Sequence, residues 1–222
     1  MLALASPLFA QTGFPFQDES LKYSINYPSG LSLGGATFSA RHTASGWNFE
    51  ATLSAGIPGF AISDKYQSSV TAALCSVSLE RSITHGKKKT QEKTTFDQEK
   101  GKAHRVTVFP KDGGESDLDL PPCARDAVAF IYYTRREMGQ GRMPPAQKIF
   151  LGSAYSVRVE YTGAMTIPVA DKQTVTDHVV AYLKGPQSDF NFEIFFARDT
   201  ARTPLLIRVP LSMGTFSMEL VR

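Results

Sequence analysis

The chain has 222 residues, of which 42% are hydrophobic, and its formal net charge is +3. This length suits one large all-β domain more readily than two small ones, and it is sufficient to bury a sizeable core. The charge excess is small and, apart from Lys87–Lys89, spread along the chain. This distribution excludes the basic surface of a nucleic-acid-binding protein. No stretch is long and apolar enough to span a bilayer as a helix.

The N-terminal segment has features of the end of a secretory signal peptide. Residues 1–10 form a short apolar stretch that includes Pro7, and Ala10 precedes the polar Gln11. The positively charged segment that usually opens such a signal is missing, so an apolar tail without a targeting role is the alternative. No cysteine follows that would take a lipid anchor. We expect residues 1–10 to be a residual signal peptide and the mature protein to be periplasmic or secreted in a bacterial envelope.

Cys75 and Cys123 are the only cysteines of the chain. An even number of cysteines in an exported chain favours a disulfide. It would close a loop of about fifty residues and contribute about 4 kcal/mol in the chain-entropy model. Two buried free thiols are the alternative. Neither cysteine has another cysteine or a histidine at ligand spacing, so we expect no metal site and no cofactor.

Apolar and polar residues alternate along most of the chain, with the period of strands that face a core on one side. About a dozen segments show this pattern. They are residues 21–27, 36–40, 47–53, 60–70, 74–83, 94–97, 103–109, 147–151, 154–161, 174–183, 190–196, 205–209 and 216–220. The acidic stretch Asp112–Asp119 is expected to be a loop. Because the crossovers needed for parallel pairing are absent, we predict one antiparallel sheet and a single domain over residues 19–222.

One segment has the features of a helix instead. Asp126 can accept hydrogen bonds from the free N–H groups of a first turn, and Gly139 is a suitable stop. Arg135 and Arg136 lie where the helix dipole favours cations. The apolar residues between the two ends occupy nearly every side: Val128, Phe130, Ile131, Tyr132 and Tyr133. We therefore predict a mainly β protein in which a single curved antiparallel sheet, a half-barrel or open barrel, wraps one central helix near residues 126–138.

Several short motifs together resemble a known family. They are Glu19-Ser-Leu-Lys-Tyr23 with Gly34-Gly35-Ala36, Phe96-Asp97, Asp126 through Arg135, and Asp199-Thr-Ala-Arg202-Thr-Pro204 followed by Gly214 and Glu219-Leu220. Their order and spacing resemble the exported domain-of-unknown-function family 3108 (DUF3108). The resemblance implies export, a mostly antiparallel β fold and kinship to the half-barrel of periplasmic lipoprotein carriers, but no assigned activity. Ala129-Phe130 stand where the family often has a small polar residue, which weakens any polar role there.

The helix and several aromatic residues supply candidate ligand-binding groups. Tyr132, Tyr133 and Arg135 have the chemistry to bind an acyl chain and its polar head. Alternatively, the tyrosines pack in the core while the arginine lies along its surface. Four further aromatic residues are candidates for an apolar lining: Trp47, Phe49, Phe192 and Phe196. The same four residues also suit the filling of a core.

The turn Asp199-x-x-Arg202-x-Pro204 is the sharpest local signal. The expected role of Asp199 is to cap the turn and pair with Arg202, while Pro204 fixes the entry to the next strand. The alternative is that Arg202 holds an anionic head group at the rim of a cavity.

No pattern in the chain indicates catalysis or a metal. The carboxylates of Asp112–Asp119 are oxygen ligands of the kind calcium prefers, but their spacing fits no standard loop, so a solvated loop is the alternative. Asp177 and His178 adjoin in a predicted strand, so their side chains face opposite ways. Nucleophile elbows, phosphate-binding loops and dinucleotide fingerprints are absent.

These observations favour an exported cell-envelope protein without catalytic activity, a binding or carrier module for a lipid, an acyl chain or a lipidated partner. A structural scaffold that contacts an envelope protein is the alternative, and a hydrolase with a dispersed site is a third hypothesis. We expect a monomer that neither binds nucleic acid nor spans the membrane.

Overall fold

The computed structural model describes residues 18–57, 59–170, 172–186, 189–211 and 214–221. The expected signal peptide at residues 1–10 lies outside this part of the chain. The strands of the described part are β1 (Glu19–Asn26), β2 (Ser32–Thr43), β3 (Gly46–Ile57), β4 (Phe60–Thr71), β5 (Ser76–His85), β6 (Lys88–Asp97), β7 (Lys102–Phe109), β8 (Glu115–Asp119), β9 (Arg125–Asp126), β10 (Gln147–Phe150), β11 (Ala154–Val169), β12 (Lys172–Lys184), β13 (Asp189–Ala197), β14 (Pro204–Leu211) and β15 (Gly214–Leu220). Helix α1 (Ala127–Gly139) lies between β9 and β10 in the chain.

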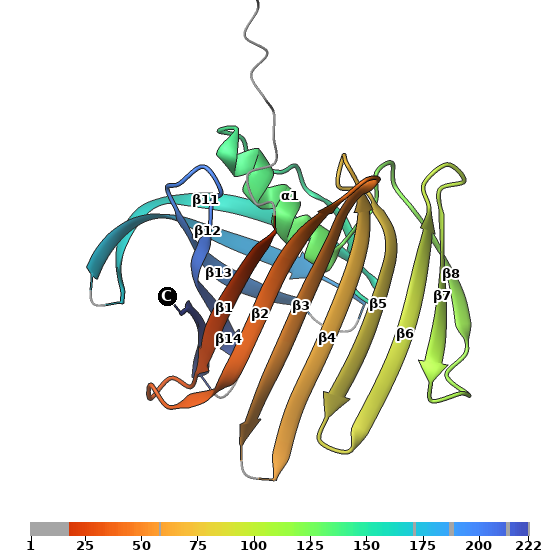
Figure 1. The fold of residues 1–222 in the computed structure, drawn as a ribbon, viewed down its shortest axis with the longest axis horizontal. Helices are drawn as coiled ribbons and strands as arrows, with labels where there is room; N and C mark the ends of the chain where they lie inside the picture. The colour runs from red at the N-terminus through yellow and green to blue at the C-terminus, as the bar shows by residue number, and fades with distance from the viewer. Residues whose placement is uncertain (1–17, 58, 171, 187–188, 212–213, 222) are drawn as a thin grey trace, which may run out of the picture.

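All of these strands belong to one sheet, in the order β8-β7-β6-β5-β4-β3-β2-β1-β15-β14-β13-β12-β11-β10-β9. Neighbouring strands are antiparallel except β9 and β10, which are parallel. The first and last strands, β1 and β15, pair in the interior of the sheet. The sheet curves around α1 and stays open, because β8 and β9 stand at opposite ends of the order (Figure 1). The prediction of a single curved, largely antiparallel sheet around one helix is confirmed.

The acidic stretch Asp112–Asp119 differs from its prediction as a loop, because its second half forms the edge strand β8. Leu118 pairs with Ala103 of β7 and packs against the adjoining apolar cluster. Asp117 points to the other face and lies 2.8 Å from His104 of the same neighbouring strand. Alternation between one partly buried leucine and outward carboxylates is therefore enough to add a strand to the sheet.

The carboxylate of Asp126 holds the start of α1 against the sheet. It caps the helix by accepting hydrogen bonds from the N–H groups of Val128 and Ala129, at 2.9 and 3.0 Å. It also accepts from the hydroxyls of Ser68 on β4 and Ser76 on β5, both at 2.6 Å. Burial raises the pKa of the Asp126 carboxyl, because complete exclusion of water disfavours its charge more than these four bonds favour it. The predicted cap is confirmed, and the two serines make it a tertiary anchor.

Gly139 does not stop the helix, as had been expected, but is its last helical residue. The residue that follows the C-cap Gln140 is Gly141. Gly141 takes the left-handed conformation, with φ 75°. Its N–H donates to the carbonyl of Met138 at 3.0 Å, and the N–H of Arg142 donates to the carbonyl of Glu137 at 2.9 Å. This pair of bonds is a Schellman motif, so Gly141 supplies the backbone freedom that was expected of Gly139.

A disulfide joins Cys75 and Cys123, as predicted, next to the anchored end of the helix. Gln98 reinforces the same junction by donating to the carbonyls of Ser76 and Ala124, at 2.6 and 3.0 Å. The segment before α1 is thus tied to β5 by one covalent bond and several hydrogen bonds.

Asp126→Ala should lower the free energy of unfolding by about 3 kcal/mol or more, because it leaves two buried hydroxyls and two first-turn N–H groups without their acceptor. Asp126→Asn keeps a cap of the same shape, so it should lower the free energy of unfolding by less than half of this amount. Urea denaturation followed by circular dichroism measures both losses. An alanine variant as stable as the wild type would contradict the anchoring role.

Replacing both cysteines by serine should lower the free energy of unfolding by up to about 4 kcal/mol, because the unfolded chain regains the freedom of the closed loop. The same denaturation experiment measures the loss, with the reduced wild-type protein as the matched comparison. An unchanged transition midpoint would show that the bridge adds nothing to the Asp126 anchor.

Candidate functional site

The concave face of the sheet receives every second side chain of each strand, and α1 covers one end of it (Figure 1). The ring of Tyr132 stacks on that of Phe49 from β3, with centroids 4.0 Å apart. On the opposite half of the sheet, Phe130 packs with Val157 of β11 and Leu183 of β12. The helix therefore fills the space between both halves, and this end of the concave face is protein core.

A buried arginine fixes the other half of the helix. The guanidinium of Arg135, whose side chain is 1% exposed, donates to both carboxylate oxygens of Glu19 at 2.7 and 2.8 Å. Its Nε also lies 3.1 and 3.2 Å from the carbonyl oxygens of Ala201 and Arg202. Arg135 thus ties α1 to β1 and to the turn between β13 and β14, and its donors are committed to the fold.

Four of the aromatic residues considered for a ligand lining are buried in this structure. Trp47 stacks on Phe49, with centroids 6.3 Å apart, and Phe49 in turn stacks on Tyr132. Phe196 belongs to a separate buried cluster with Met138. Together with Arg135, these residues have the core role that the sequence left open, because the helix packs directly on them.

Tyr133 and Phe192 keep part of their surface accessible. The Tyr133 ring lies beneath the guanidinium of Arg125, 3.7 Å from its centroid. Phe192 meets Phe190 edge to face at 5.3 Å. Both side chains pack against the cluster around Phe130 and stay partly accessible, so they remain candidates for contact with a ligand.

Arg202 does not pair with Asp199, as its position in the turn had suggested. Its guanidinium forms an ion pair with Asp177 of β12, which also binds Arg198 at 2.9 Å. Asp177 lies near the turn because β12 and β13 are neighbours. Its register partner on β13 is Phe196, which shortly precedes the turn. The arginine therefore closes a tertiary contact between the turn and the sheet.

Asp199 and Pro204 have structural positions. Asp199 caps the turn by accepting from the backbone N–H and the hydroxyl of Thr203, at 3.1 and 2.9 Å. Pro204 begins β14, and its carbonyl accepts from the hydroxyl of Tyr23 at 2.8 Å. The turn thus joins β14 to β1 across the concave face.

A row of apolar side chains crosses the concave face beside the helix, and we call it the apolar row. Its members are Ile194 of β13, Ile207 of β14, Met218 of β15, Ile25 of β1, Ala55 of β3 and Ile62 of β4. They are register neighbours, with Gly34 of β2 between Ile25 and Ala55. All except Ile25 are partly exposed. A sheet face that meets only water usually carries polar side chains. Covering this apolar row would therefore lower the free energy of the protein in water.

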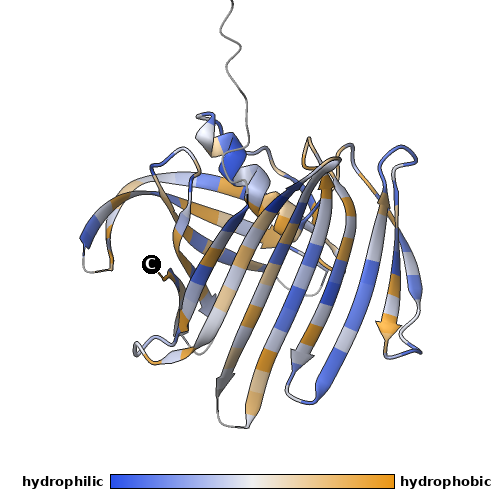
Figure 2. Ribbon diagram, viewed as in Figure 1, coloured by the Kyte–Doolittle hydropathy of each residue, from blue (hydrophilic) through white to orange (hydrophobic). Residues whose placement is uncertain are grey.

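The apolar row ends at a polar cluster, because Ile62 pairs in register with His85 of β5. His85 lies 3.0 Å from the carboxylate of Asp64, and Arg81 donates to Glu92 at 2.6 Å. Figure 2 shows the change along the sheet, since β6, which carries Glu92, is predominantly hydrophilic. The concave face therefore has an apolar part and a polar part side by side, and we call Asp64, Arg81, His85 and Glu92 the polar end.

The sequence identified the strands that carry the apolar row but did not single out its members. Alternation shows which residues point inward, but it does not show which inward residues the helix covers. Which inward residues form the apolar row depends on the register between β13, β14, β15 and β1. These strands come from both ends of the chain.

Within the described residues, no group of three or more histidine, cysteine, aspartate or glutamate side chains is arranged to hold a metal ion. In the stretch considered for calcium, Asp117 and Asp119 pair instead with His104 and Lys102. In the same described part, no helix is long and apolar enough to cross a membrane.

Comparison with protein families matches residues 22–221 to the family described as "Protein of unknown function (DUF3108)". The chain belongs to the DUF3108 family. The resemblance of the sequence motifs is thereby confirmed over nearly the whole described chain. No curated protein matches this DUF3108 chain.

The DUF3108 chain is also similar to a solved structure, the crystal structure of a β-barrel-like protein of domain of unknown function DUF1849 from Brucella abortus. The two share 9% sequence identity and superpose with a TM-score of 0.67, over 93% of this chain and 97% of the other. At this identity the likeness shows the fold alone.

Glu19→Ala should lower the free energy of unfolding by about 3 kcal/mol, because it removes the carboxylate that binds both terminal nitrogens of the buried Arg135. Arg135→Met should cost less, since Glu19, with 14% of its side chain exposed, can be hydrated when the arginine is gone. Chemical denaturation compares the two variants. Equal, small losses would show that the ion pair does not hold the helix.

Proposed function

We propose that this protein is a non-catalytic binding or carrier module of the cell envelope, and that its concave face holds the acyl chain of a lipid or of a lipidated partner. The observation that carries the proposal is the apolar row, six register neighbours of which five are partly exposed. An acyl chain that covers such a surface gains about 0.8 kcal/mol for each buried CH₂ group.

The polar end supports an amphiphile rather than a purely apolar ligand. Arg81 and His85 supply donors for an anionic head group, and the His85 side chain is 46% exposed. Asp64 and Glu92 are the present partners of His85 and Arg81, so a head group would exchange one set of polar contacts for another. A chain lying along the row from Met218 toward Ile62 would bring its head to His85.

The open sheet also suits a carrier, because a ligand can reach the concave face without unfolding a closed barrel. The disulfide supports an oxidising compartment such as the periplasm. One observation favours the scaffold alternative: β8 is an edge strand that can accept a strand from a partner. Its exposed Glu115, Asp117 and Asp119 disfavour that pairing, so the carrier function is preferred.

Met218→Glu should abolish or weaken binding of an acyl chain, because it places a charge in the middle of the apolar row. Ser217→Glu is the matched control, since the adjacent residue of β15 faces the opposite side of the sheet. Fluorescence of cis-parinaric acid below its aggregation concentration measures the affinity. We expect the glutamate at position 218 to raise the dissociation constant at least about tenfold, or about 1.4 kcal/mol, and the control to leave it unchanged.

Native mass spectrometry after purification from an exporting host provides an independent readout, with organic extraction to identify any bound lipid. No saturable binding by the wild-type protein, or equal binding by both variants at unchanged thermal stability, would contradict the carrier function.

A further inference from the structure

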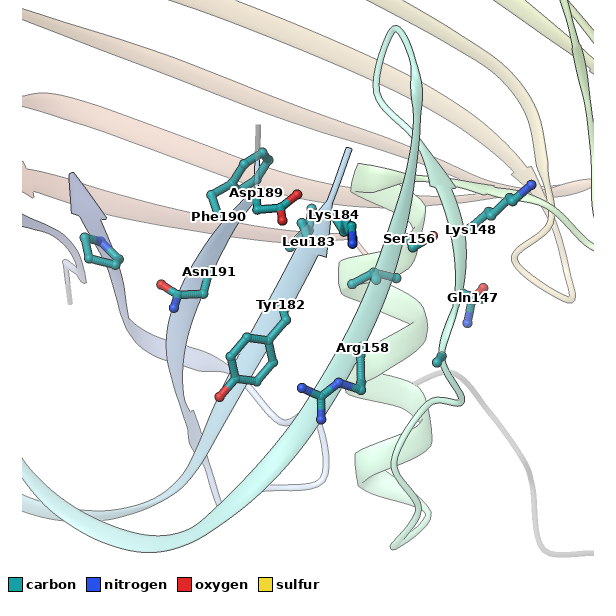
Figure 3. Close-up of a pocket in the computed structure, with 13 residues that line it drawn as sticks. Gln147, Lys148, Ser156, Arg158, Tyr182, Leu183, Lys184, Asp189, Phe190 and Asn191 are labelled. Carbon is teal, nitrogen blue, oxygen red and sulfur yellow. The ribbon is translucent and has the colours of Figure 1, made fainter. Parts of the chain in front are cut away.

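The convex face of the sheet carries a separate hollow over β10–β13, with a volume of about 840 Å³ (Figure 3). Its position follows from the alternation of the strands. Ile149, Val157 and Leu183 pack toward Phe130 of α1, so the residues next to them on each strand point away from the helix. The hollow is therefore on the opposite side of the sheet from the apolar row and does not depend on the proposed function.

The hollow has an excess of cations. Lys148, Arg158 and Lys184 line it together with one carboxylate, that of Asp189. Arg158 is also paired with Glu160. Lys148 is near enough to lower the pKa of the Asp119 carboxyl, whose main partner is Lys102.

The ammonium groups of the hollow retain capacity for a ligand. In the described part of the chain, neither Lys148 nor Lys184 has a carboxylate within ion-pair distance. They flank Ser156 in register, since Ser156 pairs with Lys148 on one side and with Lys184 on the other. Two positive charges on either side of a hydroxyl form a local site for an anion.

An aromatic platform stands beside the cations. The guanidinium of Arg158 lies over the Tyr182 ring, 4.7 Å from its centroid, and Tyr182 is 36% exposed. Asn191 is the register neighbour of Tyr182 on β13. Figure 3 shows Arg158, Tyr182 and Asn191 projecting on the same side of the sheet, away from α1.

Each of these groups matches part of one ligand class. A tyrosine ring offers an apolar surface to the C–H groups of a sugar ring, while a side-chain amide and a hydroxyl can donate to or accept from its hydroxyls. Lysine and arginine bind a carboxylate or phosphate through charge-assisted hydrogen bonds. Val157, Leu183, Phe190 and Pro210 add apolar surface to this polar lining, so the hollow suits a ligand that has both polar groups and apolar faces.

We propose that the hollow over β10–β13 binds an anionic saccharide, with the sugar ring against Tyr182 and its acidic group between Lys148 and Lys184. Arg158 holds the platform and contributes a third cation. Asn191 and Ser156 recognise the hydroxyls.

Titration of the ¹⁵N-labelled protein with digalacturonic acid, followed by NMR chemical shifts, tests this site. We expect saturable shifts at the residues that line the hollow and not at the apolar row. Lys148→Ala/Lys184→Ala should weaken binding by at least about tenfold. Tyr182→Ala should also weaken it, since it removes the platform without changing the charge. Lys22→Ala/Lys89→Ala removes the same charge from exposed positions elsewhere and should leave the affinity unchanged.

Lactose and inorganic phosphate separate the two halves of the proposed recognition. Weaker binding of both than of digalacturonic acid supports an anionic saccharide. Equal binding of lactose would overturn the requirement for an anion, and equal binding of phosphate would overturn the requirement for a sugar. Absence of saturable shifts with digalacturonic acid, at unchanged thermal stability of the wild-type protein, would overturn the proposal itself.

Discussion

The carboxylate of Asp126 is the interaction on which the arrangement of this protein depends. It caps α1 and accepts two serine hydroxyls from β4 and β5, so one buried group specifies both where the helix begins and which part of the sheet it lies on. Arg135 then fixes the far half of the helix to Glu19 of β1. Arg135 also donates to the carbonyls of Ala201 and Arg202 in the turn before β14, so the two attachments place the helix against both halves of the open sheet.

The position of the helix also explains the division of the concave face. Where α1 lies, aromatic residues stack into a core that leaves no room for a ligand, as Phe49 and Tyr132 show. Beside it, the inward residues of β13, β14, β15 and β1 stay apolar although the helix does not cover them completely. Filling the whole face would have required a longer helix or a second one, and the chain instead ends α1 with the Schellman motif at Gly141.

The fold was accessible from the sequence where local chemistry determines structure. The N-cap at Asp126, the period of the strands and the pairing of two cysteines each depend on features that a single segment or count displays. The site was harder to predict, because its contacts join segments that are far apart in the sequence. Arg135 and Glu19 are 116 residues apart. Arg202 pairs with Asp177 and not with Asp199, which is closer in the sequence. Trp47 and Phe49 were candidates for a ligand lining because they are large and apolar, and the same property buries them in the core.

The central claim is that the apolar row, rather than the core beneath the helix, receives an acyl chain. The most direct measurement is methyl NMR of the isoleucine-labelled protein during titration with palmitate below its aggregation concentration. The account predicts that the methyl signals of Ile25, Ile62, Ile194 and Ile207 shift together and saturate, while those of the buried Ile149 and Ile167 stay in place. Uniform shifts of all six residues, or none at all, would contradict it.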